Sequence, residues 1–280
     1  MSSKRILITG AGGFIGGGLF RKLNAYNPVG VILHSKEGGD GNFIQADLTD
    51  ADRVKAVFDR VQPTTVFHFA AFLSPKRNEE SPLQARETNI GITRNIVDNI
   101  SGDTHIIFPS TDKVFDGVDP SPNEESPINP LWLYGELKAE CEEIIKSKTG
   151  KYHIVRLPIV HSYGEPTRIS TRSGRGSFID RAIIDLKAGK TVTVFDNVER
   201  CFLRIEELLA LFEVFIHDTH YGTFHVGTKM MNYYDRLCGL CEELNMGCEG
   251  RIIPTVGNAR PRAQNLNTNK LKKTFGMVLT

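Results

Sequence analysis

A net charge is what this sequence most plainly lacks. Its 34 Lys and Arg residues are balanced by 33 Asp and Glu residues, which leaves a formal charge of +1 over 280 residues. Binding of nucleic acid through bulk electrostatics needs a basic excess or a basic stripe, so we expect no nucleic-acid partner. Long apolar runs are missing as well, since the stretch over residues 65–73 is far shorter than the ~20 residues that span a bilayer. We therefore expect no membrane segment.

Cysteines are few and odd in number, at positions 141, 201, 238, 241 and 248. Such a set favours reduced thiols over a disulfide framework, and the N-terminus lacks the apolar core of a signal peptide. We therefore predict a cytoplasmic protein. Cys238 and Cys241 form a CxxC pair, but zinc needs four ligands and no second pair has matching spacing. We interpret the pair as helix packing and expect no metal site.

Apolar strands alternate with amphipathic stretches over the first part of the chain, as in parallel βαβ units. This rhythm predicts strands over residues 5–9, 29–34, 42–46, 65–71, 104–110 and 152–157. It also predicts a helix that ends near residue 23, and helices over residues 50–61, 83–100 and 133–147. A loop with four prolines covers residues 120–130. The fold class that follows is α/β, with a doubly wound parallel sheet.

The rhythm breaks after residue 160. Residues 167–177 are rich in Ser, Thr, Gly and Arg and predict a surface loop. Helices are expected over residues 178–188, 206–217, 233–245 and 267–275, and strands over 192–195 and 223–226. We divide the chain into a dinucleotide-binding domain, residues 1–160, and a smaller mixed α/β C-terminal substrate lobe, residues 161–280. The two are interleaved, and part of residues 190–230 is expected to return to the first domain.

A glycine-rich turn follows the first predicted strand and opens the first helix, with the pattern TGxxGxxG from Thr9 to Gly16. Glycines allow the tight turn, the approach of the backbone to a pyrophosphate, and close packing of helix on strand. This context predicts a Rossmann-type dinucleotide site. The second strand ends in His34, Ser35 and Lys36, without the acid that accepts from the ribose 2′-OH of NAD. Ser35 and Lys36 therefore favour NADP(H), with NAD(H) as the alternative.

Tyr134 and Lys138 form a YxxxK pair at the start of a predicted helix. Residues four apart share a helical face, where a cation lowers the pKa of a phenol and prepares it for proton transfer. Ser110, Thr111 and Asp112 follow the fifth strand, at the edge where open α/β sheets bind ligands. The alternative for Tyr134 and Lys138 is an exposed helical pair without a catalytic role. The alternative for residues 110–112 is an ordinary turn.

Taken together, the glycine turn, Asp47-Leu48, the run His68-Phe69-Ala70-Ala71, Asn89 and YGELK resemble the extended short-chain dehydrogenase/reductase superfamily, of the NAD-dependent epimerase/dehydratase type. The segment STDKVFDG, residues 110–117, and the run Ala259-Arg260-Pro261-Arg262 are similar to the dTDP-4-dehydrorhamnose reductase branch. That branch also contains the non-catalytic regulatory β subunit of methionine adenosyltransferase. The resemblance covers essentially the whole chain.

The resemblance implies a role for each matching position. The catalytic set would be Thr111, Tyr134 and Lys138, with Tyr134 as the proton donor and Lys138 lowering its pKa. Together with Ser35 and Lys36 from the second strand end, and besides Tyr134 and Lys138, the candidate cofactor residues are Gly10, Gly13, Phe14, Ile15, Gly16, Asp47, Leu48, Phe69, Ala70, Ala71, Asn89, Pro158 and Ile159. The candidate substrate residues are Asp112, Phe178, Arg200 and Arg262, the two arginines for a diphosphate.

Departures from the family pattern reduce the number of reactions that the resemblance allows. The Asp-Glu acid pair of sugar-nucleotide dehydratases is absent, because Lys113 follows Asp112. Pro109 before the STD segment is also unusual for the family. We expect an NAD(P)H-dependent reductase of a nucleotide-linked 4-keto-6-deoxy sugar, with a nucleotide-diphosphate sugar as substrate. A nucleotide-sugar epimerase with tightly bound NAD and a non-catalytic dinucleotide-binding regulatory subunit are the alternatives. A homodimer is left open.

Overall fold

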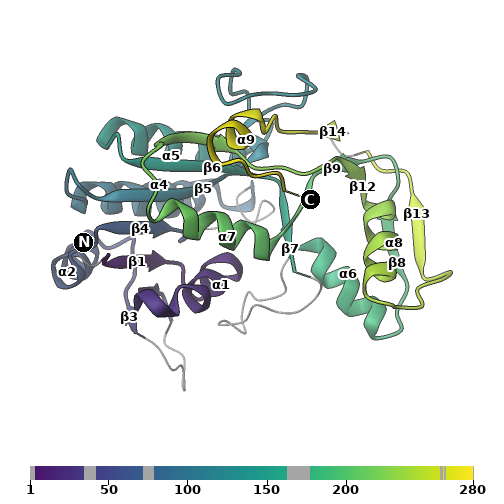
Figure 1. The fold of residues 1–280 in the computed structure, drawn as a ribbon, viewed down its shortest axis with the longest axis horizontal. Coiled ribbons are helices and arrows are strands. Elements are labelled where there is room, and N and C mark those ends of the chain that lie inside the picture. Colours follow the sequence, from purple (N-terminus) through teal and green to yellow (C-terminus); the bar gives the residue numbers. More distant parts are fainter. Residues whose placement is uncertain are drawn as a thin grey trace.

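A seven-stranded parallel sheet forms the centre of the molecule (Figure 1). The computed structural model describes residues 4–34, 42–71, 79–162, 177–258, 261 and 263–279. The strand order is β11-β6-β5-β4-β1-β2-β3, and every neighbouring pair is parallel. The strands are β1 (Ile6–Thr9), β2 (Val29–Ile32), β3 (Phe43–Gln45), β4 (Thr65–His68), β5 (His105–Thr111), β6 (Tyr152–Leu157) and β11 (Gly222–His225). The expected doubly wound α/β sheet is confirmed, with the order reversing between β1 and β4.

Helices cover both faces of this sheet. One apolar core lies under α1 (Phe14–Lys22), α7 (Ile205–Phe215) and α9 (Asn269–Phe275). The other lies under α2 (Ala51–Val61), α4 (Pro82–Asn99) and α5 (Leu133–Lys148). Strands buried on both faces read as continuous apolar runs, which is why the sequence signal for the sheet was strong. Among the described residues, none of the helices combines the length and apolar character that crossing a membrane requires.

Local signals fix where several helices begin and end. The Asp50 carboxylate accepts hydrogen bonds from the amides of Asp52 and Arg53, which caps α2 one residue after the predicted start. Ser177 and Asp180 form a reciprocal capping box at the start of α6 (Phe178–Lys187). These capped ends explain why the predicted helix boundaries hold to within about one or two residues, the usual scatter between assignments.

A smaller group of elements lies beside the carboxyl edge of the sheet, where α6 and α8 (Tyr233–Glu243) stand next to one another (Figure 1). Short strands connect it: β7 (Ile159–His161) pairs with β10 (Phe202–Arg204), and β8 (Val192–Phe195) pairs with β13 (Ile252–Thr255). A third small sheet contains β12 (Met231–Asn232), β9 (Glu199–Arg200) and β14 (Ala263–Gln264). Most of these two- to four-residue strands carry no alternating pattern that the sequence could reveal.

The chain returns to the large sheet after part of the smaller group has formed, because β11 pairs with β6 at the sheet edge. The division into residues 1–160 and 161–280 stays a prediction. The fourth strand ends at His68 rather than at the predicted Ala71, although the Phe69 amide still donates to the carbonyl of Thr9 and the Ala70 amide to its side chain.

The cysteine expectation is wrong in one respect. The structure joins Cys241 to Cys248 in a disulfide, whereas Cys141, Cys201 and Cys238 are free thiols. After α8 ends, the chain turns back and brings Cys248 onto the face of the helix that carries Cys241. A separation of seven residues across a turn has no signature in the sequence. Both Cys238 and Cys241 lie in α8, as predicted for helix packing.

Buried histidines predict acid sensitivity. Burial lowers the pKa of His68, His105 and His225 to about 3, and the pKa of His153 and His161 to about 4. In the unfolded chain these rings take up protons below pH ~6.5, but in the folded protein they do so only near the lowered pKa values. The stability that they contribute is complete above pH ~6.5 and is lost as the pH falls toward 4.

We therefore expect the free energy of unfolding to fall between pH 7.5 and pH 5, by at most about 2 kcal/mol for each fully buried ring, and the urea midpoint of unfolding to fall with it. The exposed His34 provides a control, because His34→Gln should leave this pH dependence unchanged. A midpoint that stays constant over this interval would contradict the neutral buried state of these rings.

Candidate functional site

The glycine turn lies at the carboxyl end of β1, beside the point where the strand order reverses. Gly10 adopts φ +64°, a conformation that side chains disfavour, and a Cβ atom there would lie 2.8 Å from the amide nitrogen of Ala70. A Cβ on Gly16 would lie 2.4 Å from the carbonyl oxygen of Gly10. The glycines therefore hold β1, α1 and the end of β4 closer together than any side chain permits.

The start of α1 suits an anion. Its N-cap is Gly13, which has no side chain to cap the helix, and no acidic residue occupies the first turn. The amides at such an N-terminus favour a phosphate group, and the helix dipole adds to this preference. Gly13, Phe14 and Ile15 are all partly exposed at this point. The described residues thus fit the pyrophosphate of a dinucleotide, and their role in holding it stays a prediction.

Gly16→Ala tests this arrangement. The added methyl group collides with backbone that has no room to move, so we expect loss of dinucleotide binding by at least about tenfold together with lower stability. Gly91→Ala in α4 is the matched control, because a Cβ there meets no atom within 4 Å. That variant should bind normally and gain up to about 1 kcal/mol in stability from helix propensity. Calorimetric titration with NADPH and thermal unfolding give both results, and equal behaviour of the two variants would contradict the close approach.

A polar chain that the sequence did not reveal links β1 to β4. The Oγ1 atom of Thr9 accepts a hydrogen bond from the amide of Ala70 and lies 3.1 Å from Nδ1 of His68. Nε2 of His68 lies 3.0 Å from Oγ1 of Thr93 on α4. A neutral ring suits this chain, in agreement with the lowered pKa of His68. His68 therefore holds the segment of Phe69 and Ala70 that is predicted to line the dinucleotide.

The remaining predicted cofactor residues lie at the same edge of the sheet with different burial. Asp47 is exposed and accepts from the amide and hydroxyl of Thr49, which lower the pKa of its carboxyl. Leu48, Phe69 and Asn89 are buried, and the amide of Asn89 donates to the carbonyl of Ala85. The others are the partly exposed Ala71, the buried Pro158 and the partly buried Ile159 at the start of β7. Ser35 and Lys36 lie outside the described residues.

Thr111, Asp112 and Tyr134 come together where β5 ends and α5 begins. A 3-10 turn (Asp112–Val114) follows β5, and Gly135 packs so tightly on it that a Cβ would lie 2.2 Å from the Lys113 carbonyl oxygen. The Thr111 hydroxyl donates to Asp112, 3.1 Å away. Burial raises the pKa of Asp112 and also that of Tyr134, which the carboxylate of Asp112 raises further. Tyr134 remains partly exposed and has no hydrogen-bond partner among the residues that the structure describes.

Lys138 lies on the same helix but has a partner of its own. Its ammonium group donates to the carbonyl oxygen of Pro109 at 2.8 Å and stands 4.3 Å from the centre of the Phe108 ring. Burial lowers the pKa of Lys138 to about 8. The expected lowering of the Tyr134 pKa by Lys138 is not seen here, because burial and the neighbouring Asp112 and Cys141 act in the opposite direction. Pro109, the departure noted in the sequence, contributes the carbonyl that holds Lys138.

The smaller group of elements supplies Arg200, which is 7% exposed. Its Nη1 atom donates to the Glu199 carbonyl and its Nη2 atom to the Pro261 carbonyl. Its charge acts on the pKa of Asp112 and on that of Tyr233, which places all three groups in one region. Tyr233 escaped the sequence analysis because a Tyr at a helix start carries no motif.

Phe178 and the C-terminal segment complete this region. The exposed ring of Phe178 packs edge-on against Tyr233, with 5.7 Å between their centres. Gln264 on β14 donates to the carbonyls of Asp112 and Phe115, which ties the C-terminal segment to the turn after β5. Arg262 and residues 163–176, with most of the predicted surface loop, lie outside the described residues.

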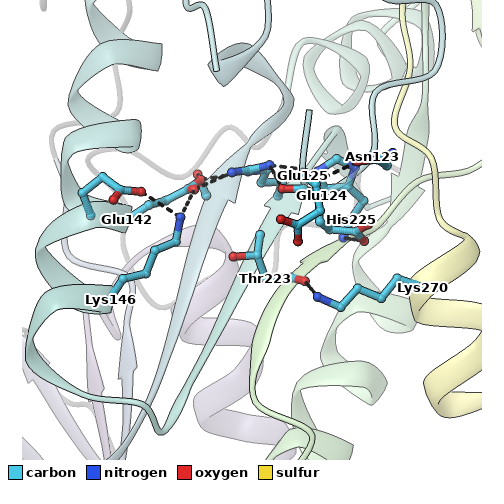
Figure 2. Close-up of polar contacts among 11 residues, drawn as sticks. Asn123, Glu124, Glu125, Glu142, Lys146, Thr223, His225 and Lys270 are labelled. Carbon is cyan, nitrogen blue, oxygen red and sulfur yellow. Dashed lines mark hydrogen bonds and ion pairs between the residues drawn. The ribbon is translucent and has the colours of Figure 1, made fainter. Parts of the chain in front are cut away.

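Figure 2 shows the polar contacts around a buried ion pair that joins β6 to α5. The guanidinium group of Arg156 on β6 holds the carboxylate of Glu142 on α5 through two nitrogens, at 3.1 and 2.8 Å. The two side chains are 2% and 0% exposed. Ser110 donates its hydroxyl to the same carboxylate, and Nη1 of Arg156 lies 3.2 Å from Nε2 of His225 on β11. This network joins the residue before Thr111 to the helix that carries Tyr134 and Lys138.

The loop of four prolines is joined to the same network (Figure 2). Glu124 accepts a hydrogen bond from the amide of His225 through its carboxylate and one from Arg156 through its carbonyl. The Pro122 carbonyl lies 3.2 Å from Nδ1 of His225 and accepts from the amide of Asn267. The loop, which leads along the chain to Tyr134, is therefore held by β6, β11 and the C-terminal segment.

Comparisons with known proteins agree with this geometry. Solved structures of the same fold include the dTDP-4-dehydrorhamnose reductase of Bacillus anthracis in complex with NADP, with a TM-score of 0.83, 23% identity and coverage of 100% of this chain and 94% of that one. The UDP-glucose 4-epimerase of Thermotoga maritima with UDP-glucose gives a TM-score of 0.82 at 21% identity, over 99% and 94% of the two chains. At these identities the likeness establishes the fold.

Similar curated proteins carry two different names. Methionine adenosyltransferase 2 subunit beta of Bos taurus is 28% identical over 98% of this chain and 83% of its own length. The dTDP-4-dehydrorhamnose reductase of Aggregatibacter actinomycetemcomitans is 26% identical over 98% of this chain and 94% of its own length. The model of the NAD-dependent epimerase/dehydratase family matches residues 6–227. With a dinucleotide-type glycine turn, a parallel sheet and a match over most of its length, the chain belongs to the NAD-dependent epimerase/dehydratase family.

Proposed function

We propose that this protein is an NADP(H)-dependent reductase of a nucleotide-linked 4-keto-6-deoxy sugar. The observation that carries the proposal is the position of Asp112. Its carboxyl group acts on the pKa of Tyr134, and the charge of Arg200 acts on the pKa of Asp112 itself, which places the three groups in one region. A phenol suited to proton transfer and an arginine suited to a diphosphate therefore border one site, built from both parts of the chain.

The residues of the chain have distinct tasks in this reaction. The amides at the start of α1 would hold the pyrophosphate of the cofactor, and Lys138 would meet its ribose. When bound, the reduced nicotinamide supplies the hydride that reduces the C4 carbonyl. The Thr111 hydroxyl, which donates to Asp112 in the structure, would turn to donate to the carbonyl oxygen, and Tyr134 would give its proton to that oxygen as negative charge develops. Arg200 orients the diphosphate.

The test is incubation of the purified protein with NADPH, or with NADH, and dTDP- or UDP-4-keto-6-deoxyglucose, followed through the absorbance of the reduced nicotinamide. Oxidation that depends on the sugar nucleotide supports the reductase, and the ratio of the two rates decides between the cofactors. A protein that binds NADPH but oxidises none with either substrate contradicts the proposal. Purification with tightly bound NAD, without consumption of external cofactor, would favour the epimerase.

One observation favours a second candidate, a dinucleotide-binding subunit that regulates another enzyme without chemistry of its own. The Lys138 ammonium is held by the Pro109 carbonyl, and nothing in the described surroundings of Tyr134 lowers the pKa of its phenol. The similarity to methionine adenosyltransferase 2 subunit beta supports the same reading. Binding of NADPH without turnover, together with a stable complex with a methionine adenosyltransferase on gel filtration, would establish this candidate instead.

A further inference from the structure

A cavity lies at the opposite edge of the sheet from the glycine turn. It has a volume of about 390 Å³ and opens at the amino ends of β1, β2 and β3 and the last turn of α2. Small-molecule sites usually measure ~300–1,000 Å³, so the volume suits a small metabolite rather than a dinucleotide. Three cations, Lys4, Arg5 and Arg60, line it beside apolar residues such as Ile44 and Val61. Among the described residues, no Asp or Glu lines this cavity.

The positive charges of this cavity are not neutralised within the described part of the chain. Lys4 and Arg60 make no ion pair or side-chain hydrogen bond there, and Arg5 donates its Nε atom to a neutral carbonyl, that of Gln62. On the same helix as Arg60, Lys55 is paired with Asp59 at 2.5 Å. Like charges gathered without a counterion repel each other, so an anion that enters gains from all three.

The cations are more than the carboxyl end of α2 requires for its own stabilisation. The negative end of the α2 dipole lies at the cavity, where cations are favourable. Arg5 already satisfies the carbonyl of Gln62, the C-cap of this helix. Lys4 and Arg60 remain available to a ligand. The planar guanidinium group of Arg60 and the compact ammonium group of Lys4 together suit the oxygens of a phosphate.

We propose that this cavity binds a small metabolite that carries a phosphomonoester, with its organic part against the apolar wall of Ile44 and Val61. The site is distinct from the predicted pyrophosphate site. Lys4 and Arg5 precede β1 and Gly10 follows it, which puts roughly 13 Å of extended strand between them. The proposal therefore does not depend on the reductase function and is tested without turnover.

The experiment is a titration of the ¹⁵N-labelled full-length chain, saturated with NADPH, with glucose 6-phosphate as the probe. We expect shifts in the backbone amides of Val29, Ile44 and Val61 and none at Gly10 or Gly13. The double variant Lys4→Ala/Arg60→Ala should weaken binding about 100-fold, at roughly tenfold for each charge-assisted contact. Lys148→Ala is the matched control, because Lys148 is paired with Asp98 on the surface and its loss should leave the affinity unchanged.

Three results would overturn the proposal. The first is that the amide shifts are confined to the glycine turn, or that no shifts occur even when the probe is raised to 50 times about 1 mM, a dissociation constant at the weak end for metabolites. The second is equal binding by the double variant and the unchanged chain. The third is equal response to glucose or to sulfate, which would show that no phosphorylated metabolite is recognised.

Discussion

Replacement of Tyr134 by Phe should reduce the rate of NADPH oxidation about 10²–10⁴-fold, the range in which a positioned proton donor contributes. Tyr134 is partly exposed at the site, and its phenol has no hydrogen-bond partner among the described residues. Phe retains the ring and its packing. The loss should therefore appear in kcat. The dissociation constant for NADPH, measured by fluorescence titration, should change by less than about twofold.

Tyr152→Phe is the matched control for this variant. Tyr152 begins β6 at the amino edge of the sheet, away from Asp112 and Arg200, and should tolerate loss of its hydroxyl without a change in rate. A Tyr134→Phe protein that turns over like the unchanged chain would remove Tyr134 from the mechanism, although it would leave the dinucleotide site intact.

Removal of the Glu142 carboxylate should cost about 3–5 kcal/mol of the free energy of unfolding. Glu142→Ala leaves the fully buried guanidinium of Arg156 without its bidentate partner and deprives Ser110 of its acceptor. An unpaired buried charge is expensive because the protein interior does not replace the water that solvates it when unfolded. The change is measured as the urea midpoint multiplied by the slope of the unfolding transition.

The neighbouring Glu143 provides the control. It is 67% exposed and pairs with Lys146, whose ammonium group also lies 3.7 Å from Glu142. Glu143→Ala should change the free energy of unfolding by less than about 1 kcal/mol, as surface ion pairs do. Similar losses in the two variants would mean that the buried pair contributes no more than a surface pair. A Glu142→Gln variant should recover part of the loss, since its amide oxygen still accepts from Arg156.

The parts of the fold that depend on local pattern were predictable from the sequence. The strands of the large sheet are continuous apolar runs, Asp50 marks the start of α2, and the glycine turn needs the geometry that Gly10 and Gly16 adopt. The grouping of Thr111, Asp112 and Tyr134 was also within reach, because β5 and the start of α5 meet at the carboxyl edge of the sheet. Their assigned roles stay predictions.

Contacts between distant positions were beyond prediction. The bond from Lys138 to the Pro109 carbonyl depends on how closely α5 packs against β5, which a helical spacing does not specify. The pair of Glu142 and Arg156 joins a helix to a strand, and each residue alone reads as a solvated charge. His68 reads as part of a strand end, and its bonds to Thr9 and Thr93 come from two other elements.

The late entry of β11 into the sheet has a consequence for synthesis on the ribosome. The first six strands of the sheet are complete by Leu157, yet the outer neighbour of β6 begins only at Gly222. The helix α7, which covers one face through Leu208 and Phe212, is also made in this interval. At ~5–20 residues per second, the nascent chain exposes the edge of β6 and an apolar face for several seconds. An unpaired strand edge and an apolar face are the surfaces that chaperones bind, and the sheet is complete only when β11, which follows α6 and α7 in the chain, has been made.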